Sequence, residues 1–356
     1  MKNFLLYTTL AFASILSAQT DTEKASETVS KSEIEGHIYF LADDVLKGRA
    51  TGSPELKIAA SYLANTLRSY GIKPNPASGD YYQKVEMFRF YLNEKIDLSL
   101  NGINFPEVVA FDIDAIDSEE DAVYLNYGLE ADYKGKDVKG KIIIVKAGTP
   151  DAVELRPALG SRAPKRELAI KNGARGLIEI GSFDQAIWPR FKHAFEERVS
   201  LSEGEKEPLP LYVWIQTSQE ELDKLGSETL KIKIKSNGIQ KEILQSQNVV
   251  GVLEGTDANL KNEYVIYSAH YDHIGIGKPD AKGDSIYNGA RDNAIGTTAV
   301  LTMAENLAKY PTKRSALFIL FTGEEMGLLG SQYYVQNPVL PLNQMIYCFN
   351  TDGGGY

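Results

Sequence analysis

Histidine and acidic residues gather at four places in the last third of this sequence, and their types suit metal chemistry. These residues are His270 with Asp272, Asp292, Glu324 with Glu325, and Asp352. Imidazole nitrogens and carboxylate oxygens are ligands of zinc in proteins, and one carboxylate can bridge two zinc ions. A metal pair lowers the pKa of a bound water, and a carboxylate that holds no metal can accept the proton of that water. The residue types therefore predict metal-assisted hydrolysis.

The elements that must position these residues are strands alternating with helices. Apolar runs predict strands over 248–253, 263–269, 315–322 and 344–350, and a helix over 292–310. The run SALFILFT at 315–322 is typical of a strand that is buried on both faces. This order predicts an α/β fold with a mixed, largely parallel sheet and helices on both faces. The charged residues then meet at the carboxyl ends of the strands, where such sheets bind ligands.

Four motifs in this region together resemble the co-catalytic zinc aminopeptidases of the M28 metallopeptidase family. The motifs are HYDHIG at 270–275, NGARDN at 288–293, FTGEEMGLLGS at 321–331 and NTD at 350–352. The resemblance runs from about residue 30 to the end of the sequence. It implies a zinc-exopeptidase, phosphorylase/hydrolase-like fold and a cofactor of two Zn²⁺ ions.

The same resemblance implies a role for each candidate residue. The metal ligands would be His270 and Asp352 on one zinc, Glu325 on the other, and Asp292 on both. Glu324 would be the catalytic general base. Asp272 would contribute to catalysis through His270, because it would accept the free N–H of that imidazole and fix its tautomer.

Some positions depart from the family pattern or stand outside it. The family's second zinc normally takes a histidine from well downstream of Asp352, and no histidine follows His273 in this sequence. We therefore expect a C-terminally truncated chain, with a one-metal or inactive variant as the alternative. His273 has no ligand role in the pattern, so we expect it to pack or to hydrogen-bond. Asn293 is expected to follow Asp292 through a cis peptide bond, as is often the case in this family.

The N-terminal residues predict export and the start of a peptidase domain. Residues 1–18 combine a positive Lys2, a short apolar core and a small-residue exit, as in a signal peptide. We therefore expect a periplasmic or extracellular protein, with a buried N-terminal helix as the alternative. The first segment of the peptidase domain is predicted over 27–95, with helices over 32–48 and 54–70.

The middle of the chain has a different character. Residues 96–245 contain short strand-like runs and one helical run at 165–172, which predicts a β-rich α+β insertion. The stretches GKIIIV at 140–145 and NGARGLI at 172–178 resemble a protease-associated (PA) domain. The remaining segment of the peptidase domain is then predicted over 246–356, incomplete at its C-terminus.

The composition of the chain limits the kinds of molecule that it is expected to bind. The 356 residues carry a formal net charge of −10 without a long basic run, which argues against nucleic acid and anionic membranes. The apolar core near the N-terminus is too short to span a bilayer and has no cysteine beside it, so we expect no stable membrane anchor. Cys348 lies in an apolar run and is predicted to be a packed core thiol. His37 is predicted to be structural, and His193 to have no functional role.

These features predict a secreted zinc-dependent aminopeptidase that acts on peptides. A metal-bound hydroxide would attack the N-terminal peptide bond, and Glu324 would pass the proton to the leaving amine. Carboxypeptidase or single-zinc glutaminyl cyclase activity on the same fold is an alternative. A second alternative is a noncatalytic binding protein with a degenerate peptidase domain.

Overall fold

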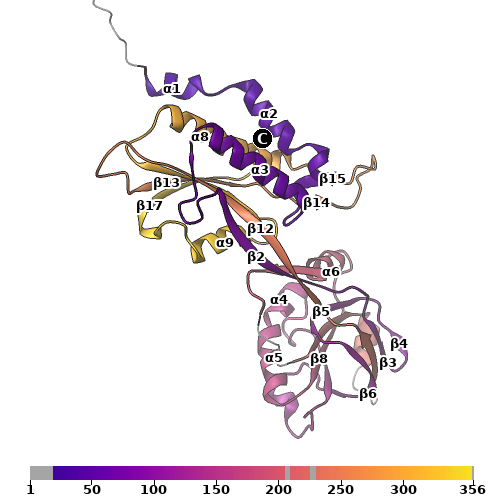
Figure 1. The fold of residues 1–356 in the computed structure, drawn as a ribbon. Coiled ribbons are helices and arrows are strands. Elements are labelled where there is room, and N and C mark those ends of the chain that lie inside the picture. The colour runs from indigo at the N-terminus through magenta and orange to yellow at the C-terminus, as the bar shows by residue number, and fades with distance from the viewer. Residues whose placement is uncertain (1–18, 205–208, 225–229, 355–356) are drawn as a thin grey trace, which may run out of the picture. The chain divides into compact units, whose positions relative to one another are not determined.

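The computed structural model of the chain describes residues 19–204, 209–224 and 230–354. The predicted signal peptide, residues 1–18, lies outside the described residues. The chain divides into two compact units (Figure 1). The first unit comprises Met1–Val85 and Ser246–Tyr356, and the second unit comprises Glu86–Gln245. The second unit therefore interrupts the chain of the first.

A seven-stranded mixed sheet lies at the centre of the first unit. Its order is β17-β13-β16-β12-β2-β9, with β1 paired to β12; β9 belongs to the second unit and pairs with Phe88–Tyr91 of β2. Strand β13 is parallel to β16 and β17, whereas β12 is antiparallel to β16. This arrangement confirms the predicted α/β class. The strands are β1 (Lys73–Pro74), β2 (Tyr82–Tyr91), β9 (Glu197–Ser200), β12 (Gln240–Leu253), β13 (Tyr264–His270), β16 (Ser315–Phe321) and β17 (Met345–Thr351).

Helices cover both faces of this sheet, with α2, α3 and α8 on one face and α9 on the other (Figure 1). In β16, Phe318 and Leu320 belong to the core cluster that includes α3 and α8. Leu317 and Ile319 pack instead with Tyr334 of α9. The strand is thus buried on both faces, as predicted, and each such side chain contributes about 1.5–3 kcal/mol by leaving water. The helices are α1 (Asp21–Glu27), α2 (Lys31–Leu41), α3 (Pro54–Ser69), α8 (Ile295–Lys309) and α9 (Leu329–Gln336).

Helix α3 forms where its local sequence predicts it. The Ser53 hydroxyl accepts the backbone N–H of Leu56, and Pro54 occupies the first turn, where its missing N–H costs nothing. Its buried stripe includes Leu56, Ala60, Leu63 and Leu67. Gly71 follows the helix with φ +80, a left-handed conformation that glycine adopts without a steric penalty. The predicted helix over 54–70 is confirmed to within one residue.

The other helix predicted near the N-terminus, over 32–48, is shorter in the structure than in the prediction. Helix α2 stops at Leu41, and a 3₁₀ turn, η1 (Asp44–Arg49), follows it. The Asp43 carboxylate accepts the N–H of Val45 and starts this turn. Lys47 and Arg49 have φ values of 45 and 50, so a regular helix cannot continue through them.

The helix predicted over 292–310 begins later than expected. Residues Ala290–Ala294 form a π-helical turn, η3, and α8 begins at Ile295. Ala294 is the N-cap of α8, and Asp292, two residues earlier, has φ −127 and ψ 92, outside the helical region. The carboxylate is therefore carried by an irregular turn ahead of α8.

Strand β17 differs from its prediction in burial. The apolar run over 344–350 forms a strand parallel to β13, but Tyr347 and Phe349 are 59% and 53% exposed. Cys348 is also exposed, so its prediction as a packed core thiol is wrong. Strand β17 is the terminal strand in the sheet order, and an apolar run predicts a strand without predicting its place in the sheet.

The second unit contains an eight-stranded sheet of order β4-β3-β11-β6-β7-β8-β10-β5. Most of the short strand-like runs noted in residues 96–245 form strands of this sheet. Across the described parts of the chain, no helix is long and apolar enough to cross a membrane. The elements are β3 (Asp97–Leu100), β4 (Ile103–Asn104), β5 (Val108–Ile113), β6 (Ile116–Tyr124), β7 (Ile142–Lys146), α4 (Leu155–Gly160), α5 (Arg162–Lys171), β8 (Gly176–Gly181), α6 (Trp188–Glu196), β10 (Leu211–Gln216), α7 (Gln219–Lys224) and β11 (Leu230–Ser236).

The isolated histidines occupy different environments. His37 is buried in α2, and its Nδ1 atom lies 2.7 Å from the Tyr62 hydroxyl oxygen. This contact supports the structural role predicted for His37. His193 lies in α6 of the second unit with its side chain 86% exposed, 3.1 Å from Glu196.

A buried ion pair lies in the core of the second unit. The Lys165 ammonium contacts the Glu179 carboxylate, and both side chains are at most 2% exposed. Lys165 Nζ also donates to the carbonyl of Lys146 at 2.7 Å, and the Tyr212 hydroxyl donates to Glu179 at 2.6 Å. Because each charge is paired and hydrogen-bonded, loss of one partner leaves the other buried without compensation.

We predict that Lys165→Met destabilises the second unit by about 3–5 kcal/mol, since Glu179 loses its cation. Urea unfolding followed by tryptophan fluorescence measures this, because both tryptophans, Trp188 and Trp214, are buried in the second unit. Lys141→Met is the matched control: its pair with Asp137 is exposed, so the change should stay within about 1 kcal/mol. Equal effects of the two substitutions would contradict the prediction.

Candidate metal centre

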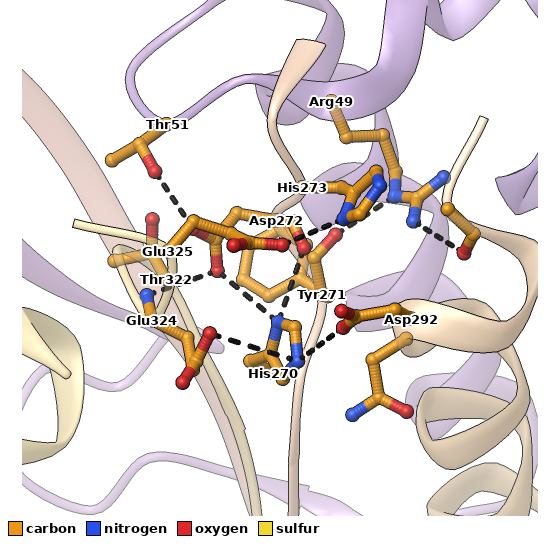
Figure 2. A network of polar contacts seen from close by, with 12 residues as sticks. Arg49, Thr51, His270, Tyr271, Asp272, His273, Asp292, Thr322, Glu324 and Glu325 are labelled. Atoms are coloured by element: carbon orange, nitrogen blue, oxygen red, sulfur yellow. Dashed lines mark hydrogen bonds and ion pairs between the residues drawn. The ribbon is translucent and has the colours of Figure 1, made fainter. Parts of the chain in front are cut away.

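The predicted site residues come together at one edge of the sheet in the first unit. His270 is the last residue of β13 and lies opposite Phe321, the last residue of β16. Glu324 and Glu325 follow β16, and Asp352 follows β17. Since these three strands are parallel, their carboxyl ends meet at the same edge. Asp292 reaches this edge from η3 (Figure 2).

One group of possible ligands surrounds the His270 imidazole. Its Nε2 atom lies 3.0 Å from Asp292 Oδ1 and 3.3 Å from Asp352 Oδ1. The three residues offer ligand atoms that all lie within 4.8 Å of one another. The imidazole is 3% exposed, whereas the Asp292 and Asp352 side chains are 55% and 56% exposed. The group is therefore anchored by a buried nitrogen and is open on its carboxylate side.

A second group shares Asp292 with the first. His273 Nδ1 lies 2.6 Å from Glu325 Oε1, and His273, Asp292 and Glu325 offer ligand atoms within 4.8 Å of one another. Asp292 is thus placed between two sets of donors, as a bridging ligand would be. His273 hydrogen-bonds, as expected, but it also belongs to this group, which the sequence reasoning missed.

The donor sets fit zinc. Each group offers an imidazole nitrogen and two carboxylates, and zinc binds such atoms at about 2.0–2.2 Å. Atoms within 4.8 Å of one another can therefore be reached by a single ion with small side-chain adjustments. Two such groups that share one carboxylate match the donor pattern of a paired metal site.

The charges of the site shift the pKa of two members. Burial lowers the pKa of His270, but hydrogen bonding and charge from Asp272, with the charges of Glu324 and Asp292, outweigh this and raise the pKa to about 9. Burial raises the pKa of Glu324, and the neighbouring carboxylates of Glu325, Asp272 and Asp352 add to the rise while His270 opposes it. The site concentrates negative charge that a bound cation would offset.

Asp272 is buried beneath the ligands and holds two segments. Its carboxylate accepts the Thr51 hydroxyl at 2.7 Å and the backbone N–H of Glu324 at 3.2 Å (Figure 2). His270 Nδ1 lies 3.1 Å from the backbone carbonyl of Asp272 and 3.7 Å from its carboxylate. The carbonyl is therefore the nearer acceptor for the imidazole N–H, and this contact leaves Nε2 facing Asp292 and Asp352.

Asn293 links the turn that carries Asp292 to the end of β17. The peptide bond between Asp292 and Asn293 is cis, as expected. The Asn293 side chain donates to the carbonyl of Thr351 at 2.8 Å and accepts the N–H of Gly296 at 3.0 Å. A Cβ atom at Gly296 would lie 2.2 Å from Asn293 Oδ1, so this approach requires glycine. These contacts fix the spacing between the elements that carry Asp292 and Asp352.

Comparison with known proteins agrees with this geometry. Residues 248–356, which contain all of the candidate ligands, match the sequence profile of peptidase family M28. The part of the chain that carries the site is thus similar to peptidase family M28. Its candidate ligands and Glu324 all lie inside the matched region.

Relatives extend the similarity beyond residues 248–356. The chain is 26% identical to aminopeptidase YwaD of Bacillus subtilis, over 95% of this chain and 68% of that protein. It is 27% identical to a probable leucine aminopeptidase 2 of Aspergillus oryzae, over 84% of this chain and 57% of that protein. The fold is similar to that of a solved aminopeptidase from Aneurinibacillus sp. strain AM-1, with a TM-score of 0.60, 23% identity, and 93% and 72% of the two chains covered.

Proposed function

We propose that the chain acts as a secreted zinc-dependent aminopeptidase that hydrolyses the N-terminal peptide bond of peptides. The observation that carries the proposal is the position of Asp292 in two ligand groups at the carboxyl ends of parallel strands. The similarity to peptidase family M28 and the aminopeptidases among the relatives support the same reaction class. Export rests on the signal-like residues 1–18.

Two zinc ions fit the residues at hand. His270 and Asp352 would hold one ion, Glu325 and His273 the other, and Asp292 both. When bound, the metal pair supplies Lewis acidity at the substrate carbonyl and an activated water. Asp272 and Asn293 would keep the ligand-bearing turns in place through the contacts described above.

Glu324 is suited to move the proton. It belongs to neither ligand group, and its Oε2 atom lies 3.9 Å from His270 Nε2. Its side chain is 28% exposed, so a substrate can reach it. Because burial and neighbouring carboxylates raise its pKa, Glu324 holds a proton more readily than an exposed glutamate. Glu324 would accept a proton from the attacking water and deliver it to the leaving amine.

A cavity of about 320 Å³ opens beside these groups. His270, Glu324 and Asp352 lie in its wall, together with apolar side chains that include Ile319, Leu328 and Met345. An apolar substrate side chain fits such a lining better than a charged one, because a buried charge would need a partner. The proposed substrates are therefore peptides that begin with a residue such as leucine.

We predict that the zinc-loaded protein hydrolyses leucyl p-nitroanilide in preference to the aspartyl compound. A chelator should abolish this activity, and added Zn²⁺ should restore it. Peptides with C-terminal Glu or N-terminal Gln test carboxypeptidase and cyclase activity in parallel. Release of a C-terminal residue, or cyclisation of Gln, without cleavage of the anilide would contradict the proposal.

Glu324→Gln should lower kcat by about 10²–10⁴-fold, because the amide cannot accept the proton of the attacking water. Bound zinc, measured by atomic emission, should stay at the wild-type level, since Glu324 is not among the proposed ligands. Glu254→Gln, at an exposed side chain outside the site, serves as the control and should leave both quantities unchanged. Joint loss of zinc and activity would instead place Glu324 among the ligands.

His273→Ala should reduce bound zinc from about two ions per chain to about one, because one of the two groups loses its imidazole. The measurement is metal content after dialysis against a weak chelator. His193→Ala removes an exposed histidine of the second unit and should leave metal content unchanged. Retention of both ions by the His273 variant would show that another residue completes the second group.

A further inference from the structure

A buried arginine lies between the loops that carry the ligands but belongs to neither ligand group. Arg49 is 1% exposed. Its Nε atom donates to the carbonyl of Tyr271 at 2.9 Å. Nη1 donates to the carbonyls of Leu41 and, at 2.7 Å, Asn288, and Nη2 donates to that of Gly289 at 3.0 Å. The guanidinium therefore joins the loop that follows His270 to the segment before Asp292 (Figure 2).

The backbone around Arg49 contacts the same two loops. Its carbonyl accepts the N–H of His273 at 3.1 Å. The neighbouring Gly48 has φ +67, and a Cβ atom there would lie 2.4 Å from the carbonyl oxygen of Tyr287. Gly289 is equally confined, since its Cβ would lie 2.7 Å from both Arg49 Nη2 and His273 Cγ. Glycine at both positions lets the chain approach the ligand loops this closely.

We use the name clamp segment for residues 41–51. Besides Arg49, this segment contributes the Thr51 hydroxyl, which holds Asp272 at 2.7 Å. Its Ala42 carbonyl and Asp44 carboxylate both accept the side-chain amide of Asn288 at 2.8 Å. The clamp segment thus touches both ligand loops, from more than two hundred residues away in the sequence.

The clamp segment adopts a costly backbone conformation to make these contacts. Arg49 and Lys47 have φ values of 50 and 45, in the left-handed region that residues with a Cβ atom rarely adopt. A residue in this region persists only where other interactions hold it. The hydrogen bonds of the guanidinium supply that restraint, and all but the one to Leu41 are made to the ligand loops.

The charge of Arg49 also faces the site. Burial lowers the pKa of Arg49 to about 10, while the carboxylates of Asp272, Asp292 and Glu325 act in the opposite direction. The guanidinium therefore stays charged at neutral pH. The hydrogen bonds described above all go to carbonyl oxygens, so its charge is left to act on those carboxylates through space.

We propose that Arg49 is a positioning residue of the metal centre, which fixes the separation of the His270–His273 and Asn288–Asp292 loops so that both ligand groups are preformed. The inference rests on the proposed two-zinc function. The proposal attributes the positioning of the two loops to the planar guanidinium with its several N–H donors, and not to the positive charge alone. Lysine keeps the charge but lacks that planar set of donors, so it separates the two contributions.

The test compares Arg49→Lys and Arg49→Met with the wild type. Zinc affinity is measured by competition with a chromophoric chelator, and ligand geometry by the visible spectrum of the Co²⁺-substituted protein. Both variants should bind zinc about 10–100-fold more weakly, the range seen when groups that orient metal ligands are lost. The cobalt spectrum should change as well. Arg68→Lys, at an exposed arginine of α3, is the matched control and should leave both readouts unchanged.

The possible outcomes separate this inference from the function on which it rests. If Arg49→Met fails to fold, the zinc affinity and cobalt spectrum of Arg49→Lys alone test the positioning role. A lysine variant with wild-type zinc affinity and cobalt spectrum, even if less stable to heat, would overturn the positioning role while leaving the metallopeptidase proposal intact. A wild-type chain that binds no zinc would overturn both.

Discussion

The first unit has to hold several carboxylates closer together than their mutual repulsion favours. Asp292, Asp352, Glu324 and Glu325 all lie around two imidazoles at one edge of the sheet. The rise in the pKa of Glu324 is one sign of this crowding. The protein meets the constraint by placing these carboxylates on three separate segments, η3 and the residues after β16 and β17, and by tying those segments together with buried hydrogen bonds. A divalent cation is the partner that such an arrangement favours.

Rigid strands set some of this geometry, and turns set the rest. The parallel register of β13, β16 and β17 brings His270, Glu324 and Asp352 to a common edge without any specific turn chemistry. Asp292 needs additional side-chain contacts to fix its position, because it lies in the irregular turn η3 and not on a strand or regular helix. Asn293, on its C-terminal side, and Arg49, acting on the residues before it, hold that turn through side-chain contacts to backbone groups.

The sequence predicts regular elements better than the turns between them. The apolar run of β16 and the capped, apolar stripe of α3 each favour one type of secondary structure. Once the strands are predicted, the histidine and carboxylates that follow them can be placed at the strand ends. His273 lies in a loop, where neither helical nor strand periodicity tells which way a side chain points. Arg49 directly follows a run predicted to be helical, and its partners in the ligand loops lie more than two hundred residues away. Cys348 shows a third limit, because an apolar run does not reveal whether a strand is central or at the edge.

The division of the chain also has a consequence for how the protein is made. The second unit, Glu86–Gln245, is continuous in sequence, so all of its residues are present before the first unit is complete. The sheet of the first unit must wait, because β12, β13, β16 and β17 end or lie wholly after Ser246. Every candidate ligand arrives later still, between His270 and Asp352. The clamp segment is therefore synthesised early, but the ligand loops that it contacts are synthesised much later. The metal centre is thus among the final regions of the molecule to assemble.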